Sequence, residues 1–454
     1  MIATLLDQHA EEAAFLAGLR SYAVGAPHYD LAHLGDLDER IEAHLDGLQI
    51  AGLKGLHLLL EQLTPHAQGE VFAIAALALR QSNDSALETL YQHLRANPEG
   101  EPLLVAALGW LEWHEVSMAI ERDLNSTDAQ RRRIALDAHV LHGKDPGPAL
   151  LSALGHGDAS VLAAAARLAG TLRRRDLLQP LRQYRLHGDD DVRFWSNWAS
   201  AQLGDQEALG NLRLFAERPG DLRQPALEVL LAWQPREASI AWLRGLMQSE
   251  AHRHMAIQAI GLLGDPQTIA WLIRQMHELP TARAAGEAFS LITGADLAEL
   301  DLELSVYPDY DEGPTDDPSD ANVAMDPDID LPWPDPQQVE QWWQGQQHSL
   351  QPGTGYLLGQ PFSERQCMAV LRSGTQRQRR AAARLLARYQ PTSVLFATDA
   401  PARRQSDCWA AEPRRSTTQG ECEHAQEIPA GPVAILQRQP WAEIPLEETA
   451  CSQA

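Results

Sequence analysis

The sequence predicts an all-α protein, a right-handed α-solenoid of helix-turn-helix repeats about 30 residues long. Two observations predict this fold. Apolar, helix-length segments alternate with short Gly/Asp/Pro turns from residue 67 to residue 298. The turn Leu203-Gly204-Asp205 also recurs two repeats later as Leu263-Gly264-Asp265. A single unit of this kind cannot bury its apolar face, so neighbouring units are expected to stack on one another.

Residues 1–66 are predicted to be N-terminal helices and a capping repeat. An entry helix and a loop through Pro27 come first. The segment Asp36-Leu37-Asp38-Glu39 has the pattern of a capping box, which predicts that the next helix begins there. Apolar residues then recur at the spacing of an amphipathic helix. A second helix is expected over residues 53–63.

The solenoid proper is predicted over residues 67–298. Ala and Leu dominate the first helix of each pair, as close packing between helices requires. Several tryptophans occupy apolar positions, where core packing is the expected role: Trp110, Trp195, Trp198, Trp233, Trp242 and Trp271. No strand pattern is evident.

Residues 299–336 are predicted to be an acidic, Pro-rich linker without regular structure. The segment holds 13 Asp and Glu, and no Lys or Arg occurs between Arg283 and Arg365. A small helical module is expected over residues 337–405, with a helix carrying Trp342 and Trp343 and a helix over residues 375–390. Residues 406–454 lack periodicity and are predicted to be a disordered tail.

The net charge of −25 and the pI of about 5.0 argue against nucleic acid or an anionic membrane as partner. The first residues lack the apolar stretch of a secretory signal, and no apolar run is long enough to span a bilayer. The four cysteines have neither zinc-site nor disulfide-framework spacing. We therefore expect a cytoplasmic protein without membrane insertion.

No phosphate-binding loop, nucleophile elbow or zinc-protease motif occurs, so we predict no catalytic residues, no cofactor and no metal. His252 and His254 lie two apart, point to opposite sides of a helix, and are expected at the surface. The second hypothesis is a metal- or cofactor-dependent enzyme on the same scaffold. It would use histidines of the repeats, namely His114, His139, His142 and His277.

Two arginine patterns are candidate partner-binding sites. Arg182, Arg213 and Arg244 recur every 31 residues on successive second helices, so their side chains are expected on one face. This "arginine ladder" either forms Arg–Asp contacts between repeats or lines a binding groove. The "arginine stripe" of the helix over residues 375–390 comprises Arg377, Arg380, Arg384 and Arg388. It is a solvated face, a docking site for the acidic linker, or a site for an acidic partner. Trp342 and Trp343 are further candidate partner-binding residues.

The Leu-Gly-Asp turns resemble short HEAT-like repeats of the phycobilisome-lyase type. Deoxyhypusine hydroxylases resemble this chain in their repeats, but their di-iron site draws on four His-Glu pairs. Here only His114-Glu115 and His277-Glu278 occur, at non-equivalent places. A di-iron site is therefore not expected.

The C-terminal module carries more specific features, including Leu331-Pro332-Trp333-Pro334, Trp342-Trp343 and Pro352-Gly353-Thr354-Gly355. Together with the segment 374–383, these resemble an uncharacterised bacterial HEAT-like family encoded near type VI secretion genes. The resemblance covers about residues 30–405. It implies a non-enzymatic scaffold or adaptor whose partner is a secretion component or effector. An immunity protein that binds one toxin is a further alternative.

The separation of charge predicts one intramolecular contact. We expect the acidic linker to lie near a basic surface, either the arginine stripe or the arginine ladder. Exposed ion pairs each contribute only about 0–1 kcal/mol, so such docking would depend on many contacts.

Overall fold

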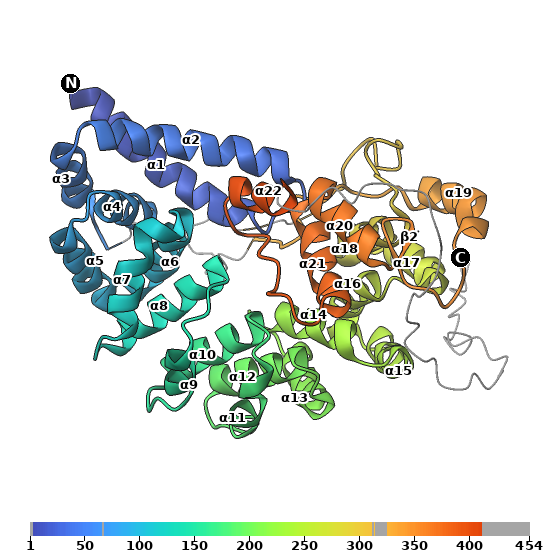
Figure 1. Cartoon of the computed structure of the whole chain (residues 1–454). Helices are drawn as coiled ribbons and strands as arrows, with labels where there is room; N and C mark the ends of the chain where they lie inside the picture. The colour runs from blue at the N-terminus through green and yellow to red at the C-terminus, as the bar shows by residue number, and fades with distance from the viewer. Residues whose placement is uncertain (1–2, 66–67, 311–312, 314–324, 411–454) are drawn as a thin grey trace, which may run out of the picture.

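A computed structural model describes residues 3–65, 68–310, 313 and 325–410. Stacked helix pairs form an arc, and the last three helices of the described chain lie inside it (Figure 1). Helices make up most of the described residues, and the two strands among them are two residues each, which confirms the predicted all-α, HEAT-like solenoid. One buried apolar core continues from the first helix to the last repeat, as expected where each repeat packs mainly on its neighbours.

The N-terminal helices differ from the prediction in one boundary. Helix α1 spans Ala3–Ala23, α2 spans Leu31–Ile50 and α3 spans Leu53–Gln62. Asp30 caps α2 by accepting a hydrogen bond from the backbone N–H of His33. The predicted start at residue 36 is therefore wrong. Asp36 and Glu39, the two capping residues of the predicted box, are exposed within α2, and Asp38 between them is buried.

The first helices of the repeats line the inner side of the arc, and the second helices lie on its outer side (Figure 1). The first helices are α4 (Gln68–Arg80), α6 (Glu101–Trp110), α8 (Ala129–His142), α10 (Ala159–Thr171), α12 (Asp190–Gln202), α14 (Arg223–Trp233), α16 (Arg253–Leu263) and α18 (Leu279–Thr293). The second helices are α5 (Asp84–Ala96), α7 (Trp113–Leu124), α9 (Pro148–Leu154), α11 (Leu178–Arg182), α13 (Gln206–Ala216), α15 (Arg236–Met247) and α17 (Ile269–Gln275). Short 3-10 turns join some of them: η1 (Pro98–Gly100), η2 (Arg175–Leu177), η3 (Glu250–His252) and η4 (Pro266–Thr268).

The Leu-Gly-Asp turns have a direct physical basis. Gly264 ends α16 in the left-handed conformation with φ of 71°, which an L-residue with a side chain rarely adopts. Asp265 then begins the next turn, and its side chain accepts a hydrogen bond from the N–H of Gln267 at 3.1 Å. Glycine thus terminates one helix, and aspartate starts the next. The motif recurs because each turn needs a residue that adopts positive φ, followed by a residue that caps the next helix.

After the last repeat the chain follows an irregular course and then forms a second group of elements. These are α19 (Pro336–Gln346), η5 (Gln347–Ser349), the short antiparallel strands β1 (Tyr356–Leu357) and β2 (Gln360–Pro361), α20 (Glu364–Ser373), α21 (Gln376–Tyr389) and α22 (Ala402–Ala410). The hairpin was not expected from the sequence. Helix α22 also extends into the segment predicted as a disordered tail. Residues 411–454 of that tail lie outside the described residues.

These C-terminal elements contact both ends of the arc. On one side α21 packs on α14 and β1 packs on α18. On the other side α22 packs on α2, and the backbone N–H of Gln376 donates to Tyr29 O at 2.7 Å. Asp38 accepts from the N–H of Ala402 at 2.7 Å and from Arg20 at 2.6 Å. We call the elements α20 to α22 the closing module, because they bridge the inner side of the solenoid.

A buried arginine holds the closing module together. Arg379 is fully buried and donates to Leu371 O at 2.8 Å, to the Gln376 side chain, and to Gln405 of α22. Burial lowers the pKa of its guanidinium to about 10, so the group remains charged at neutral pH. The side chain joins α20, α21 and α22 through amide and carbonyl oxygens.

Among the described helices, none is long and apolar enough to cross a membrane.

Candidate functional site on the inner face of the solenoid

One side chain per repeat forms a row on the inner helices. The row comprises Asp137 of α8, Arg167 of α10, Trp198 of α12, Glu228 of α14, Gln258 of α16 and Glu287 of α18, each 29 to 31 residues after the one before. Because the repeats stack in register, equivalent positions fall on one line. We call this set the inner row. The arginine ladder lies instead on the second helices.

The arginine stripe of α21 pairs with the inner row. Arg377 lies 3.0 Å from Glu287, and Arg384 lies 2.9 Å from Glu228. Arg380 approaches Glu228 at 3.6 Å, and the Arg384 guanidinium stands 5.8 Å from the centre of the Trp198 ring. The fourth member, Arg388, is exposed. Three stripe arginines thus contact three members of the inner row, Trp198, Glu228 and Glu287, rather than forming a solvated face.

Glu228 is the most buried carboxylate of this contact, with 3% of its side chain exposed. A buried carboxylate without a nearby cation carries a large desolvation penalty. Arg384 and Arg380 supply that compensation from the closing module. These ion pairs therefore help to fix the position of α21 on α14.

A second set of charges attaches the acidic segment before α19. Arg283, almost fully buried in α18, donates to Asp326 at 2.6 Å and lies 4.5 Å from the Trp333 ring centre. Nε2 of His254 donates to Asp328 Oδ2 at 2.6 Å. Arg377 donates to Pro327 O at 2.9 Å. Residues 311–312 and 314–324 of the predicted linker lie outside the described residues.

The pKa shifts in this cluster have clear physical causes. Burial alone would lower the pKa of His254, but its hydrogen bond to Asp328 and the negative charges of Asp328, Asp326 and Glu287 raise it above 6.5. Burial raises the pKa of Glu287, against the lowering effect of Arg377. His254 was expected at the surface, but its side chain is only 32% exposed, because an acidic segment from beyond the repeats contacts it.

A cavity of about 680 Å³ opens beside this cluster, between α14, α16, α18, the segment 327–332 and α21. Arg377, Arg380 and Glu287 line it together with His254 and Asp328. Apolar wall residues include Leu262, Leu291, Leu297 and Leu331. This cavity combines charged and apolar surface on the inner face, and it is the main candidate functional site.

A second cavity, of about 510 Å³, lies at the N-terminal side of the closing module. It is lined by Arg20, Arg133, Asp137 and Arg167 among others. Burial raises the pKa of Asp137, against the effect of Arg167 at 3.5 Å and Arg133 at 3.3 Å. The inner row therefore continues into this cavity.

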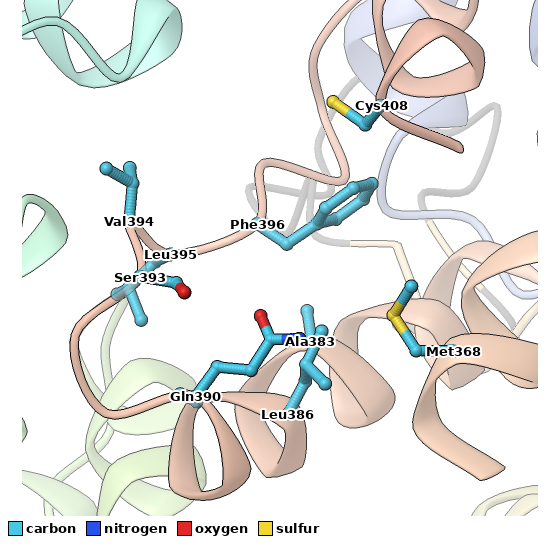
Figure 2. A pocket seen from close by; sticks show the side chains of 10 residues that line it. Met368, Ala383, Leu386, Gln390, Ser393, Val394, Leu395, Phe396 and Cys408 are labelled. Carbon is cyan, nitrogen blue, oxygen red and sulfur yellow. The ribbon is translucent and has the colours of Figure 1, made fainter. Parts of the chain in front are cut away.

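A smaller apolar cavity of about 150 Å³ lies within the closing module. Figure 2 shows Met368 and Phe396 on two of its sides, with Cys408 above Phe396. Leu386 of α21 and Val394 of the following loop also line it. Its lining carries no ionisable group apart from the Cys408 thiol.

The arginine ladder lies on the outer side and does not meet the stripe. Arg182 pairs with Asp205 of the next repeat at 2.8 Å, and Arg213 pairs with Glu217 of its own helix at 2.8 Å. Arg244 of α15 is half-buried.

Trp342 and Trp343 are half-buried on α19, with ring centres 5.7 Å and 6.5 Å from that of Phe289. The predicted site residues thus fall into separate groups.

The histidines of the enzyme hypothesis are also dispersed. His114 and His277 are exposed on different repeats. His139 contacts Lys144 O at 3.0 Å through Nδ1, and His142 contacts Leu108 O at 2.8 Å through Nε2. Burial lowers the pKa of His142 to about 4. Within the part of the chain that the structure describes, no group of three or more His, Cys, Asp or Glu is placed to hold a metal ion.

Sequence reasoning missed Glu228, Glu287, Asp328 and Arg283, and it placed His254 at the surface without a functional role. The signal for the inner row was present, because its members recur at the repeat period on the first helices. The contacts with Asp326 and Asp328 carry no periodic signal, since those residues lie outside the repeats.

A family model for HEAT repeats matches residues 147–231. This stretch runs from the start of α9 into α14, the middle of the repeat array. No curated protein matches the chain.

Proposed function

We propose that this chain is a non-enzymatic scaffold that binds another protein in the bacterial cytoplasm, as an accessory or adaptor of type VI secretion. Support comes from the HEAT repeats, a fold that commonly serves protein interaction. The resemblance of the C-terminal module to proteins encoded near secretion genes supplies the link to secretion.

The observation that carries the proposal is the division of the solenoid into two faces. The inner face holds the chain's own closing module through Glu228 and Glu287. The outer face presents large apolar side chains on three of the repeats: Met118 is 83% exposed, Leu186 82% and Leu214 60%. Two arginines of the arginine ladder lie nearby in the sequence. Arg182 ends α11, four residues before Leu186, and Arg213 precedes Leu214 in α13. Apolar and arginine side chains together are typical of protein interfaces.

Affinity purification of the tagged full-length chain from strains with active and inactive type VI secretion tests this proposal. We expect a secretion component or an effector to be recovered. Replacing Leu186 and Leu214 by Ser should abolish recovery, whereas Val306→Ser, which alters an equally exposed residue beyond the repeats, should not. Failure to recover any secretion component or effector from either strain would overturn the proposal.

The immunity-protein alternative shares this outer-face argument and differs only in its partner. Rescue of growth on co-expression with a neighbouring toxin gene would favour it over the adaptor.

A further inference from the structure

The 680 Å³ cavity on the inner face has a buried polar end and a solvent-exposed rim. Asp328 is 4% exposed, whereas Asp221, Asp296 and Arg380 at the rim are exposed. The volume falls within the range of roughly 300–1,000 Å³ that is usual for small-ligand sites. The cavity therefore offers a route from solvent to a buried carboxylate.

One oxygen of that carboxylate has no hydrogen-bond donor. Oδ2 of Asp328 accepts from His254, but Oδ1 is buried and has no hydrogen-bond partner among the described residues. Its nearest cation is Nη1 of Arg377, 3.9 Å away, which is beyond hydrogen-bond distance. A buried polar atom without a partner is unfavourable, and such atoms are rare in folded proteins. A ligand that donates a hydrogen bond at this point would satisfy it.

The arginines of the cavity already have acceptors. Arg377 donates to Glu287, to Gly25 O and to Pro327 O. Arg380 is paired with Glu228, and Arg223 donates to Arg218 O at 3.0 Å. An anionic ligand would have to compete with these contacts, whereas a donor ligand would meet the free lone pairs of Asp328 Oδ1.

The charge balance of the lining favours a cation over a neutral donor. Five carboxylates line the cavity: Asp221, Glu228, Glu287, Asp296 and Asp328. Three arginines and one histidine oppose them: Arg223, Arg377, Arg380 and His254. Even with His254 protonated, the lining has one more negative than positive charge.

We propose that this cavity binds an organic cation, a guanidinium or ammonium group that donates to Asp328 Oδ1 while its carbon chain lies along Leu262, Leu291 and Leu331. The group could belong to a free small molecule or to an arginine side chain of a peptide, and the chemistry of recognition is the same. The inference does not depend on the proposed scaffold function.

Isothermal titration of the full-length protein with three probes tests it. The probes are agmatine, the peptide Gly-Arg-Gly, and the same peptide with citrulline, a neutral isostere, in place of arginine. We expect at least one guanidinium probe to bind, and citrulline to bind at least about tenfold more weakly, since a hydrogen bond between two charged groups is stronger than one from a neutral donor. Agmatine binding would identify a small-molecule site, and binding of the arginine peptide alone would identify a peptide site.

Two variants and one control locate the binding. Asp328→Asn removes the charge, and Ser290→Trp fills the cavity from a half-buried wall position without altering a charged group. Each should weaken guanidinium binding at least about tenfold. Asp330→Asn changes an exposed acid two residues from Asp328 and should leave the affinity unchanged. If Asp328→Asn fails to fold, Ser290→Trp still tests whether the probe binds in this cavity. Absence of guanidinium binding, equal binding of citrulline, or unchanged affinity in Ser290→Trp would overturn the proposal.

Discussion

At the scale of single residues, the molecule depends on buried charges that are neutralised by residues far away in the sequence. Glu228 of α14 pairs with Arg384 of α21, 156 residues later. Asp38 of α2 accepts from the backbone of Ala402, 364 residues later. Removing one partner of such a pair leaves the other desolvated, so these positions should be sensitive to substitution.

We predict that Glu228→Gln lowers the free energy of unfolding by about 1–3 kcal/mol, because Arg384 and Arg380 lose their anionic partner while keeping partial access to water. Denaturant-induced unfolding followed by circular dichroism measures the change. Glu237→Gln, on the exposed side of α15, is the matched control and should stay within about 0.5 kcal/mol of the wild type. An equal effect of both variants would show that the Glu228 pair does not hold α21.

The His254–Asp328 pair predicts a pH dependence. A histidine whose pKa is raised on folding contributes stability below its unfolded value of 6.5, and this contribution is lost as pH rises through the folded pKa. Backbone amides of the segment 328–333 should therefore exchange hydrogen faster, after correction for intrinsic rates, as pH rises from about 6 to about 9. In His254→Gln, which keeps a donor but cannot titrate, this extra increase should vanish. A persistent increase would exclude His254 as its source.

At the scale of secondary-structure elements, close approach of the inner helices sets the spacing of the repeats. A Cβ atom on Gly170 of α10 would lie 2.7 Å from Cζ3 of Trp198 and 2.8 Å from Cα of Ala199 in α12. The second contact is with backbone and cannot be relieved by turning a side chain. Glycine at this position allows two adjacent inner helices to pack closely, with Trp198 of the inner row against them.

We predict that Gly170→Ala is destabilising by about 1–3 kcal/mol, because α10 and α12 must separate to admit the methyl group. Gly245→Ala is the opposite case: it lies in a helix, α15, with no atom within 4 Å of the added Cβ. It should stabilise by about 0.5–1 kcal/mol through helix propensity alone. Thermal unfolding of the two variants measures the change in melting temperature. A change of the same sign in both variants would refute the packing argument.

At the scale of the whole molecule, the periodic part was predictable and the closing contacts were not. Leu203-Gly204-Asp205 and its copies mark the repeats because each glycine ends a helix and each aspartate caps the next segment. The start of α2 was misplaced because Asp36 and Glu39 satisfy the capping-box pattern, whereas Asp30, six residues earlier, caps the helix. The neighbouring Asp38 binds Arg20 and Ala402 instead, a tertiary contact that carries no local signal. The stripe arginines were identified from helical spacing, but their partners Glu228 and Glu287 were not. An ion pair between a repeat and a helix outside the repeats does not alter the periodic pattern of the sequence.

The central claim is that α20 to α22 close the arc by contacting both of its ends. A distance distribution between spin labels at Gly18→Cys on α1 and Gly245→Cys on α15 tests it directly, in a background whose four native cysteines are replaced. At both positions an added Cβ meets no atom within 4 Å. We predict one narrow distribution. We also predict a broader and longer one when Asp38→Asn is combined with Gln at Arg377, Arg380 and Arg384, with helix content retained. The same distribution in both proteins would contradict the claim, because the arc would then hold its shape without the closing module.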